Sequence, residues 1–232
     1  IRLRMCQFVV LLVALVDGAA LTVRAVTVET RAARDRASMS ASSSTSTIYD
    51  VTTFGAKGDN ATLDTAAFVA AIAAVEKAGG GTVLVPPPGI YLIAPINLTS
   101  NIDFHIADGA RIVGVMNSKL WPIIPGAPSY GQGRNHGAHS PRFTSLLHGE
   151  HLVNVTIRGD GPGSVLDGQG RYWWSLCGRG LPGWNQTRGH LLEMMWVDGL
   201  VVRDLTMLDS PFWNNHIFAC NNVHVTRVDV VA

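Results

Sequence analysis

The amino-acid sequence predicts an all-β fold, a right-handed single-stranded parallel β-helix with a capping α-helix at its N-terminal end. The main observation is a repeat of alternating apolar residues near the C-terminus. The segment Asp198–Leu208 aligns with Asn221–Val231, and the offset between Leu200 and Val223 is 223 − 200 = 23 residues. Short strands at a period of about 20 to 50 residues are typical of a solenoid. A β-sandwich is the alternative, and the near-constant offset makes it less favourable.

Two earlier segments repeat the same alternation. One has Leu152, Val155 and Ile157, and the other has Ile102, Phe104 and Ile106. About 23 residues per turn leave room for three short strands and three corners. Strands of successive turns then stack about 4.8 Å apart, and alternate side chains fill the interior.

The chain is predicted to have three segments. Arg2 and Arg4 precede an apolar run over residues 8–16, which is too short to span about 30 Å of hydrocarbon. Residues 1–20 therefore resemble a secretory signal segment, with a buried strand as the alternative. Residues 21–47 are rich in Ala, Ser and Thr without apolar periodicity, which predicts a disordered lead-in. Residues 48–232 form the predicted partial β-helix domain.

One convincing helix is predicted, over residues 64–78, and everything after it is predicted as short strands. Phe68, Ile72 and Val75 recur at helical spacing among alanines. Asp64 or Thr65 can cap its start, and the glycines at 79–81 end it. This helix is well placed to cover the hydrophobic end of the coil.

Composition excludes several classes of partner. The formal net charge is only +1, so no global field favours nucleic acid or a membrane surface.

Four glycosylation sequons, at Asn60, Asn97, Asn154 and Asn185, favour an exported glycoprotein. Outside the predicted signal segment, the cysteines are Cys177 and Cys220, which either form a disulfide or stay as buried thiols.

The histidines do not predict a metal site. His136, His139, His148 and His151 cluster in the sequence but lack zinc-ligand spacing. We expect them to be surface or loop residues, and we expect no metal or other cofactor.

Several motifs together resemble glycoside hydrolase family 28, the polygalacturonases, and in particular its plant-type members. The resemblance covers residues 49–232. Its N-terminal segments resemble the first turns of pectin-active β-helix proteins in general: Phe54–Asp59, Asp64–Ala67, Gly79–Val83 and Pro88–Leu92. Later segments are similar to family 28 itself, namely Val165–Gly170 with Trp173–Trp174, Arg188–Glu193 and Asp209–His216, and Ser129–Gly131 with Gly133–Arg134 resembles its plant-type members. The sequence departs from the family pattern at Gly189 and Ile217, where proline is usual, and at Asp209, where asparagine is common.

The resemblance implies a secreted enzyme of the extracellular space or cell wall. Such an enzyme hydrolyses α-1,4-galacturonan in pectin with inversion, without a metal, and we expect it to act as a monomer. The family's catalytic motifs are Asn-Thr-Asp-Gly, Asp-Asp, Gly-His-Gly and Arg-Ile-Lys, and none occurs in these 232 residues. We therefore predict no catalytic residue and expect this chain to be inactive.

There are two alternatives. The first is a truncated coil that either binds cell-wall polysaccharide or has no function. The second is a calcium-dependent enzyme similar to pectate lyases. The family 28 motifs argue against the lyase, and no acidic cluster suited to calcium is visible.

Four residues are predicted to bind substrate: Arg188, Trp213, Asn215 and His216. Trp213, Asn215 and His216 belong to the turn expected to border the cleft, and Arg188 suits a galacturonate carboxylate or is an exposed corner residue. Trp213 either stacks on sugar rings or lies under a loop.

The period also pairs residues on successive turns. Glu193 should stack on His216, because 193 + 23 = 216. That pair could act on substrate or could only help the strands to align. Asp204 should meet Arg227 in a surface ion pair, since 204 + 23 = 227. Trp173 and Trp174 should pack their loop against the coil, and Asp167 should form turn hydrogen bonds.

Overall fold

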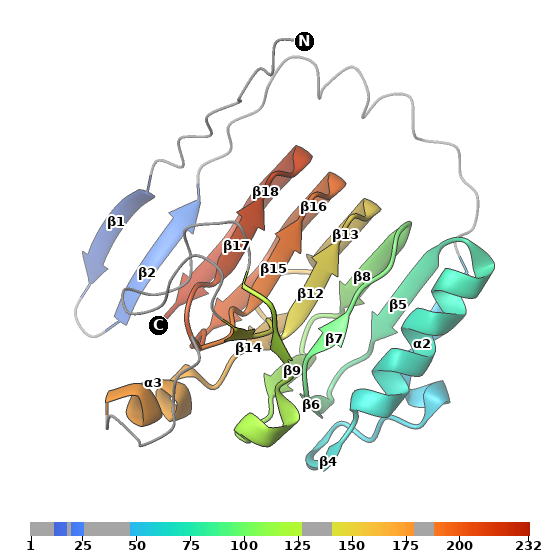
Figure 1. The fold of residues 1–232 in the computed structure, drawn as a ribbon, viewed down its shortest axis with the longest axis horizontal. Helices are drawn as coiled ribbons and strands as arrows, with labels where there is room; N and C mark the ends of the chain where they lie inside the picture. The colour runs from blue at the N-terminus through green and yellow to red at the C-terminus, as the bar shows by residue number, and fades with distance from the viewer. Residues whose placement is uncertain (1–11, 18–19, 26–46, 127–140, 179–187) are drawn as a thin grey trace.

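The protein forms a coil of parallel strands, as the sequence predicts (Figure 1). The structure is a computed structural model that describes residues 12–17, 20–25, 47–126, 141–178 and 188–232. Each full turn of the coil contributes a strand to each of three faces, so this is a parallel β-helix.

The strands divide among the three faces by their pairing. The first face contains β3 (Ile48–Asp50), β5 (Gly81–Val85), β8 (Ile102–Ile106), β13 (Val153–Gly159) and the first halves of β16 (Asp198–Leu208) and β18 (Asn221–Val231). The second contains β4 (Asp59–Leu63), β6 (Ile90–Ile93), β9 (Arg111–Gly114), β14 (Val165–Asp167) and the second halves of β16 and β18. The third contains β7 (Ile96–Asn97), β12 (Leu147–Glu150), β15 (Leu192–Met195) and β17 (Asn215–Phe218).

The strand register confirms the 23-residue repeat. Leu200 pairs with Val223, and every apolar position of β16 meets its predicted partner on β18. The looser repeats also align, because Val155 pairs with both Ile102 and Leu200. The side chains of Ile102, Val155 and Leu200 are all buried and form part of the interior of the coil.

A stacked corner maintains this register at the start of the first face. Asn101, Asn154 and Asn222 have φ between 51° and 57°, and Gly199 occupies the matching position with φ of 81°. Asparagine and glycine tolerate this left-handed conformation better than other residues do. The Asn154 Nδ2 donates to the Asn101 Oδ1 over 3.1 Å, so side-chain hydrogen bonds link the corners of successive turns.

The predicted helix is α2 (Thr65–Ala78), and it covers the N-terminal end of the coil (Figure 1). Its residues Phe68, Ile72 and Val75 are buried, and the Phe68 ring contacts Phe104 of β8. The helix ends at Gly79, which has φ of 78°. Asp64 precedes the helix without a side-chain cap, because its carboxylate accepts from the backbone amides of Lys57 and Gly58.

The prediction that only strands follow this helix is wrong. Residues 170–178 form a second helix, α3 (Gly170–Gly178). The turn just before this helix forms as predicted, because the Asp167 Oδ1 accepts a hydrogen bond from the Gln169 amide. The segment has only nine residues and begins and ends with glycine, so its intrinsic helix propensity is low. Trp173 is buried against Trp121, and the Trp174 indole donates to the Ser210 carbonyl over 3.0 Å.

The segment between β9 and β12 leaves the coil and returns. It contains the 3-10 helix η2 (Ser118–Leu120) and the antiparallel strands β10 (Ile123–Ile124) and β11 (Arg142–Phe143). Trp121 and Phe143 of this segment both pack against Trp173. A further 3-10 helix, η1 (Val51–Phe54), follows β3.

The N-terminal region differs in part from its prediction. β1 (Leu12–Asp17) and β2 (Ala20–Ala25) pair with each other, and β2 also pairs antiparallel with residues 229–231 of β18. The expected disordered lead-in is therefore a strand at residues 21–25, because the edge of β18 offers unpaired backbone groups. Residues 26–46 lie outside the described residues, and the signal segment stays a prediction. Among the helices described, none is long and apolar enough to cross a membrane.

Some of the residues in the cysteine and glycosylation predictions belong to the described part of the chain. Cys220 is a free thiol whose Sγ donates to the Met194 carbonyl over 3.3 Å, and burial raises its pKa. The Cys177 side chain and Asn185 lie outside the described residues. Asn60, Asn97 and Asn154 are exposed, and their glycosylation stays a prediction.

Candidate functional site

The candidate site lies on the outward side of the third face. His148, Glu193 and His216 occupy one row across β12, β15 and β17. The residues preceding His148 and Glu193, Leu147 and Leu192, belong to the core. Since side chains alternate along a strand, the row points away from the core.

Glu193 lies at the centre of this row and has no solvent-exposed surface. Arg142 of β11 binds it in a bidentate manner, with Nη1 2.7 Å from Oε2 and Nη2 2.8 Å from Oε1. The His216 Nδ1 lies 2.5 Å from Oε2, and the His148 Nδ1 lies 3.2 Å from Oε1. Burial alone would raise the pKa of Glu193. The hydrogen bonds from His148, His216 and Arg142 outweigh burial and hold that pKa well below its ordinary value.

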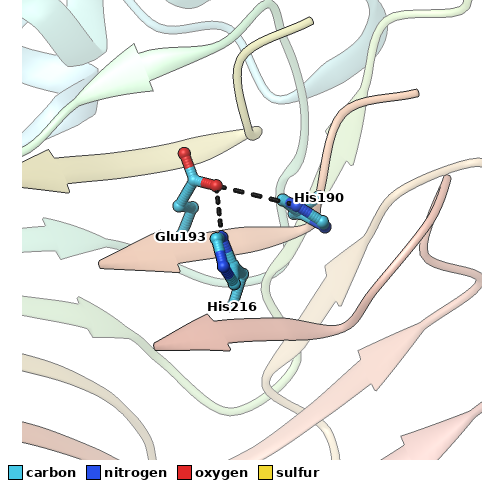
Figure 2. A group of neighbouring side chains, drawn as sticks. All are labelled: His190, Glu193 and His216. Atoms are coloured by element: carbon cyan, nitrogen blue, oxygen red, sulfur yellow. Dashed lines mark hydrogen bonds and ion pairs between the residues drawn. The ribbon is translucent and has the colours of Figure 1, made fainter. Parts of the chain in front are cut away.

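His190 contacts the same carboxylate from the segment just before β15 (Figure 2). Its Nε2 lies 3.6 Å from the Glu193 Oε2, and its side chain is 1% exposed. Its Nδ1 is buried and has no hydrogen-bond partner among the described residues. Burial lowers the pKa of His190 to about 3 despite the attraction of Glu193, so this ring is neutral near pH 7.

Aromatic rings lie beside the histidines. The Phe212 ring stacks on His190 at 5.2 Å between centroids, and the Trp213 ring meets His216 edge-on at 5.5 Å. The Arg188 guanidinium lies 5.2 Å from the centre of the Phe212 ring, a cation–π contact. The structure therefore brings three of the four predicted residues, Arg188, Trp213 and His216, around one cluster.

The fourth predicted residue, Asn215, is not part of this cluster. Asn215 pairs with Leu192, whose side chain is in the core, so Asn215 points to the opposite side of β17 from His216. Its Oδ1 is buried without a hydrogen-bond partner in the described part of the chain.

Most of the partners of Glu193 were not predicted from the sequence. His148 was expected at the surface or in a loop, but it is buried in β12 and pairs with Glu193. The 23-residue period gives no signal for this pair, because 193 − 148 = 45 residues separate two neighbouring turns, and the extra length lies between β14 and β15. Arg142 carries no such signal, since it belongs to the segment that leaves the coil. His151 is exposed and stacks on Trp196, as a surface residue does, whereas His136 and His139 lie outside the described residues.

A metal does not fit the cluster well, although His190, Glu193 and His216 place ligand atoms within 4.8 Å of one another. Arg142 already binds both carboxylate oxygens. The 2.5 Å between the His216 Nδ1 and the Glu193 Oε2 suits a hydrogen bond. Two ligands of one zinc ion, each about 2.0–2.1 Å from it, would lie about 3.3 Å apart. A metal-bound His190 would also leave its other ring N–H buried without the partner that such histidines usually have.

The cluster also lacks a pair of carboxylates able to hydrolyse a glycosidic bond. Inverting hydrolysis needs an acid and a base about 6.5–9.5 Å apart. The four strands of the third face carry two carboxylates, Glu150 and Glu193. Because Glu193 is ionised and enclosed by donors, it can neither give a proton nor activate water. The geometry is suited to binding and orienting a polar ligand.

Two family models match the chain. The model described as "Glycosyl hydrolases family 28" matches residues 131–232, which include the whole candidate site. Residues 131–232 therefore belong to glycosyl hydrolases family 28. The model described as "Rhamnogalacturonase A/epimerase, pectate lyase-like" matches residues 48–156, in the N-terminal turns of the coil.

Curated relatives of the chain include plant proteins. A probable polygalacturonase from Vitis vinifera is 35% identical over 181 residues, which are 77% of this chain and 36% of the relative. A probable polygalacturonase from Arabidopsis thaliana is 30% identical over 188 residues, 81% of this chain and 35% of the relative. The chain thus spans about a third of the length of these relatives.

A solved structure supports the same fold. The hyperthermoactive exopolygalacturonase from Thermotoga maritima matches with a TM-score of 0.64 and 24% identity, over 78% of this chain and 46% of that structure.

Proposed function

We propose that this chain supplies part of the substrate-binding surface of a secreted polygalacturonase-type hydrolase. In this proposal the complete protein hydrolyses α-1,4-galacturonan in pectin with inversion and works outside the cell as a monomer. The observation that carries the proposal is the convergence of Arg188, Trp213 and His216 on the outward side of the third face. The polygalacturonase names of the plant relatives support the choice of substrate.

The three residues suit different parts of a galacturonate unit. Arg188 is a permanently charged, planar donor that matches a carboxylate, and its contact with Phe212 holds the guanidinium near the cluster. Trp213 offers an aromatic surface for a sugar ring. His216 offers a ring nitrogen to a sugar hydroxyl.

We further propose that the 232-residue chain binds pectin without hydrolysing it. Arg142 and the histidines neutralise Glu193, the carboxylate at the centre of the site. The family's catalytic motifs are also missing from these residues. A binding protein without turnover is therefore the second candidate function, favoured by the state of Glu193.

Binding and reducing-end assays on the purified chain test both candidates. We expect oligogalacturonate to bind and no reducing ends to form. Arg188→Gln should weaken binding about tenfold, whereas Arg171→Gln should not change it. Arg171 is a matched control, because its side chain is 87% exposed and pairs only with Asp209 among the described residues.

Two results would contradict the proposal. Equal affinities of the Arg188 and Arg171 variants for oligogalacturonate would show that Arg188 does not bind the substrate. Turnover by the purified chain that disappears in Glu193→Gln would show that the chain is catalytic. Transcript sequence beyond Ala232 that encodes Asn-Thr-Asp-Gly would support a hydrolase.

A further inference from the structure

The Glu193 carboxylate contacts two histidines that differ in which ring nitrogen faces it: His216 by a hydrogen bond and His190 by a longer electrostatic contact of 3.6 Å. His216 directs Nδ1 to the Oε2 atom, whereas His190 directs Nε2 to the same atom (Figure 2). Glu193 is ionised, so it can only accept hydrogen bonds. The proton in the His216 hydrogen bond must therefore come from the ring, and at His190 the negative carboxylate favours the tautomer that turns an N–H toward it.

His216 donates from Nδ1. The 2.5 Å separation from the Glu193 Oε2 requires a shared hydrogen, and the low pKa of Glu193 places that hydrogen on the nitrogen. In the neutral ring, the lone pair is then on Nε2. No hydrogen bond joins that atom to the described residues, and it is not among the polar atoms buried without a partner. The Nε2 of His216 is thus available to a ligand.

His190 has the opposite arrangement. With the proton on Nε2, its lone pair is on Nδ1, which is buried without a partner in the described part of the chain. The reverse tautomer would bury an unpaired N–H and would turn a lone pair toward the carboxylate. Both changes are unfavourable, because unpaired buried donors and facing lone pairs cost free energy.

We propose that Glu193 is a positioning residue that fixes His216 as the Nδ1–H tautomer, so that Nε2 accepts a hydrogen bond from a sugar hydroxyl. The choice of a sugar as the ligand rests on the function proposed above, but the tautomer does not. Arg142 prevents Glu193 from turning, because it holds both carboxylate oxygens.

This assignment divides the recognition of galacturonan between two side chains. A lone pair on Nε2 attracts a hydroxyl and repels a carboxylate, so His216 recognises the part of the sugar that has no charge. Arg188 is a donor only and recognises the carboxylate. Methyl esterification of the sugar therefore weakens the contact with Arg188 and leaves the contact with His216 intact.

The tautomers can be measured directly in the wild-type chain. Long-range ¹H–¹⁵N correlation on the ¹⁵N-histidine-labelled protein at pH 7.5 distinguishes a protonated from an unprotonated ring nitrogen. We expect His216 to carry its proton on Nδ1 and His190 on Nε2. Glu193→Gln should change the His216 pattern, and Asp204→Asn, a matched carboxylate-to-amide change at the surface, should leave it unchanged. An Nε2–H tautomer of His216 in the wild type would overturn the proposal, and that measurement needs no variant.

Binding measurements test the ligand half of the proposal separately. The probes are oligogalacturonides in the free-acid and the methyl-esterified form, which carry the same ring hydroxyls. His216→Phe, which keeps an aromatic ring beside Trp213, should weaken binding of both forms about tenfold. Arg188→Gln should weaken binding of the free acid only. An unchanged affinity in His216→Phe would overturn the role as hydroxyl acceptor. Failure of the wild type to bind either probe would overturn the proposed function while leaving the tautomer result in place.

Discussion

Two arginine–carboxylate pairs in this protein use the same chemistry in opposite surroundings. Arg142 and Glu193 have side chains that are 3% and 0% exposed. Arg227 and Asp204 lie on neighbouring turns at the surface, where the arginine side chain is 65% exposed. In both pairs the guanidinium contacts both carboxylate oxygens.

The difference shows that solvent exposure decides how much an arginine–carboxylate pair contributes to stability. Water can replace either partner of the surface pair, so that pair adds little to stability. Nothing can replace Arg142 beside Glu193, because loss of the guanidinium leaves a carboxylate buried without its cation. The surface pair joins two adjacent strands, whereas the buried pair joins the coil to the segment that leaves it.

The largest expected effect comes from breaking the buried pair. Arg142→Met should lower the free energy of unfolding by about 3–5 kcal/mol, because Glu193 stays buried without its main partner. The double variant Arg142→Met with Glu193→Leu should recover most of the loss. Urea denaturation at pH 7 measures both. A loss below about 1 kcal/mol in the single variant would contradict this account.

The next effect is a dependence on pH caused by His190. The pKa of His190 is about 3 in the folded protein and about 6.5 in the unfolded chain, so the unfolded chain binds more protons between these values. Stability is thus complete above about pH 6.5 and falls as pH is lowered, by up to about 1.4 kcal/mol per pH unit. Denaturation at pH 7 and 5 should show this fall, and His190→Phe, which keeps a ring against Phe212, should reduce it. An equal fall in both proteins would assign the effect to other groups.

The surface pair should have a smaller effect that is confined to acid. Hydrogen bonds from Arg227 and Arg203 lower the pKa of Asp204 to about 2. The contribution of Asp204 is therefore present above its unfolded pKa near 4, and it is lost as pH falls toward 2. Asp204→Asn should destabilise slightly at pH 7 and not at pH 2, as thermal melts would show. A loss as large as that of Arg142→Met would remove the contrast between the two pairs.

The smallest expected effect is the response to salt. About 1 M sodium chloride screens charges in water over about 3 Å, so it should remove the difference between wild type and Asp204→Asn. The same salt should leave the effect of Arg142→Met nearly unchanged, since its site excludes water. Denaturation of both variants at low and high salt makes the comparison, and equal sensitivity would indicate that Glu193 is reached by solvent.

The sequence predicts the coil well because its register is periodic. A constant offset of 23 residues pairs Leu200 with Val223, Glu193 with His216 and Asp204 with Arg227 without knowledge of any loop. Helix α2 is also predictable, because its apolar spacing and terminal glycines agree.

The remaining features depend on segments that interrupt the period. Arg142 reaches Glu193 from outside the coil, so no spacing in the sequence relates the two residues. His148 and Glu193 are 45 residues apart yet lie on neighbouring strands, because an insertion between β14 and β15 lengthens that turn. Asn215 pairs with the core residue Leu192 and therefore points to the core side of its strand. Helix α3 is short and begins and ends with glycine, so its propensity is low, and its Trp173 packs against Trp121 of the segment outside the coil.

The stacked third face has a consequence for how the row of outward side chains can change in evolution. Each turn adds one outward side chain to the row, about 4.8 Å from the last. Duplication or loss of a whole turn would therefore lengthen or shorten the surface by a fixed step and leave every remaining contact in place. A change of one or two residues within a turn would instead shift the alternation, so that outward side chains such as His216 would point into the core.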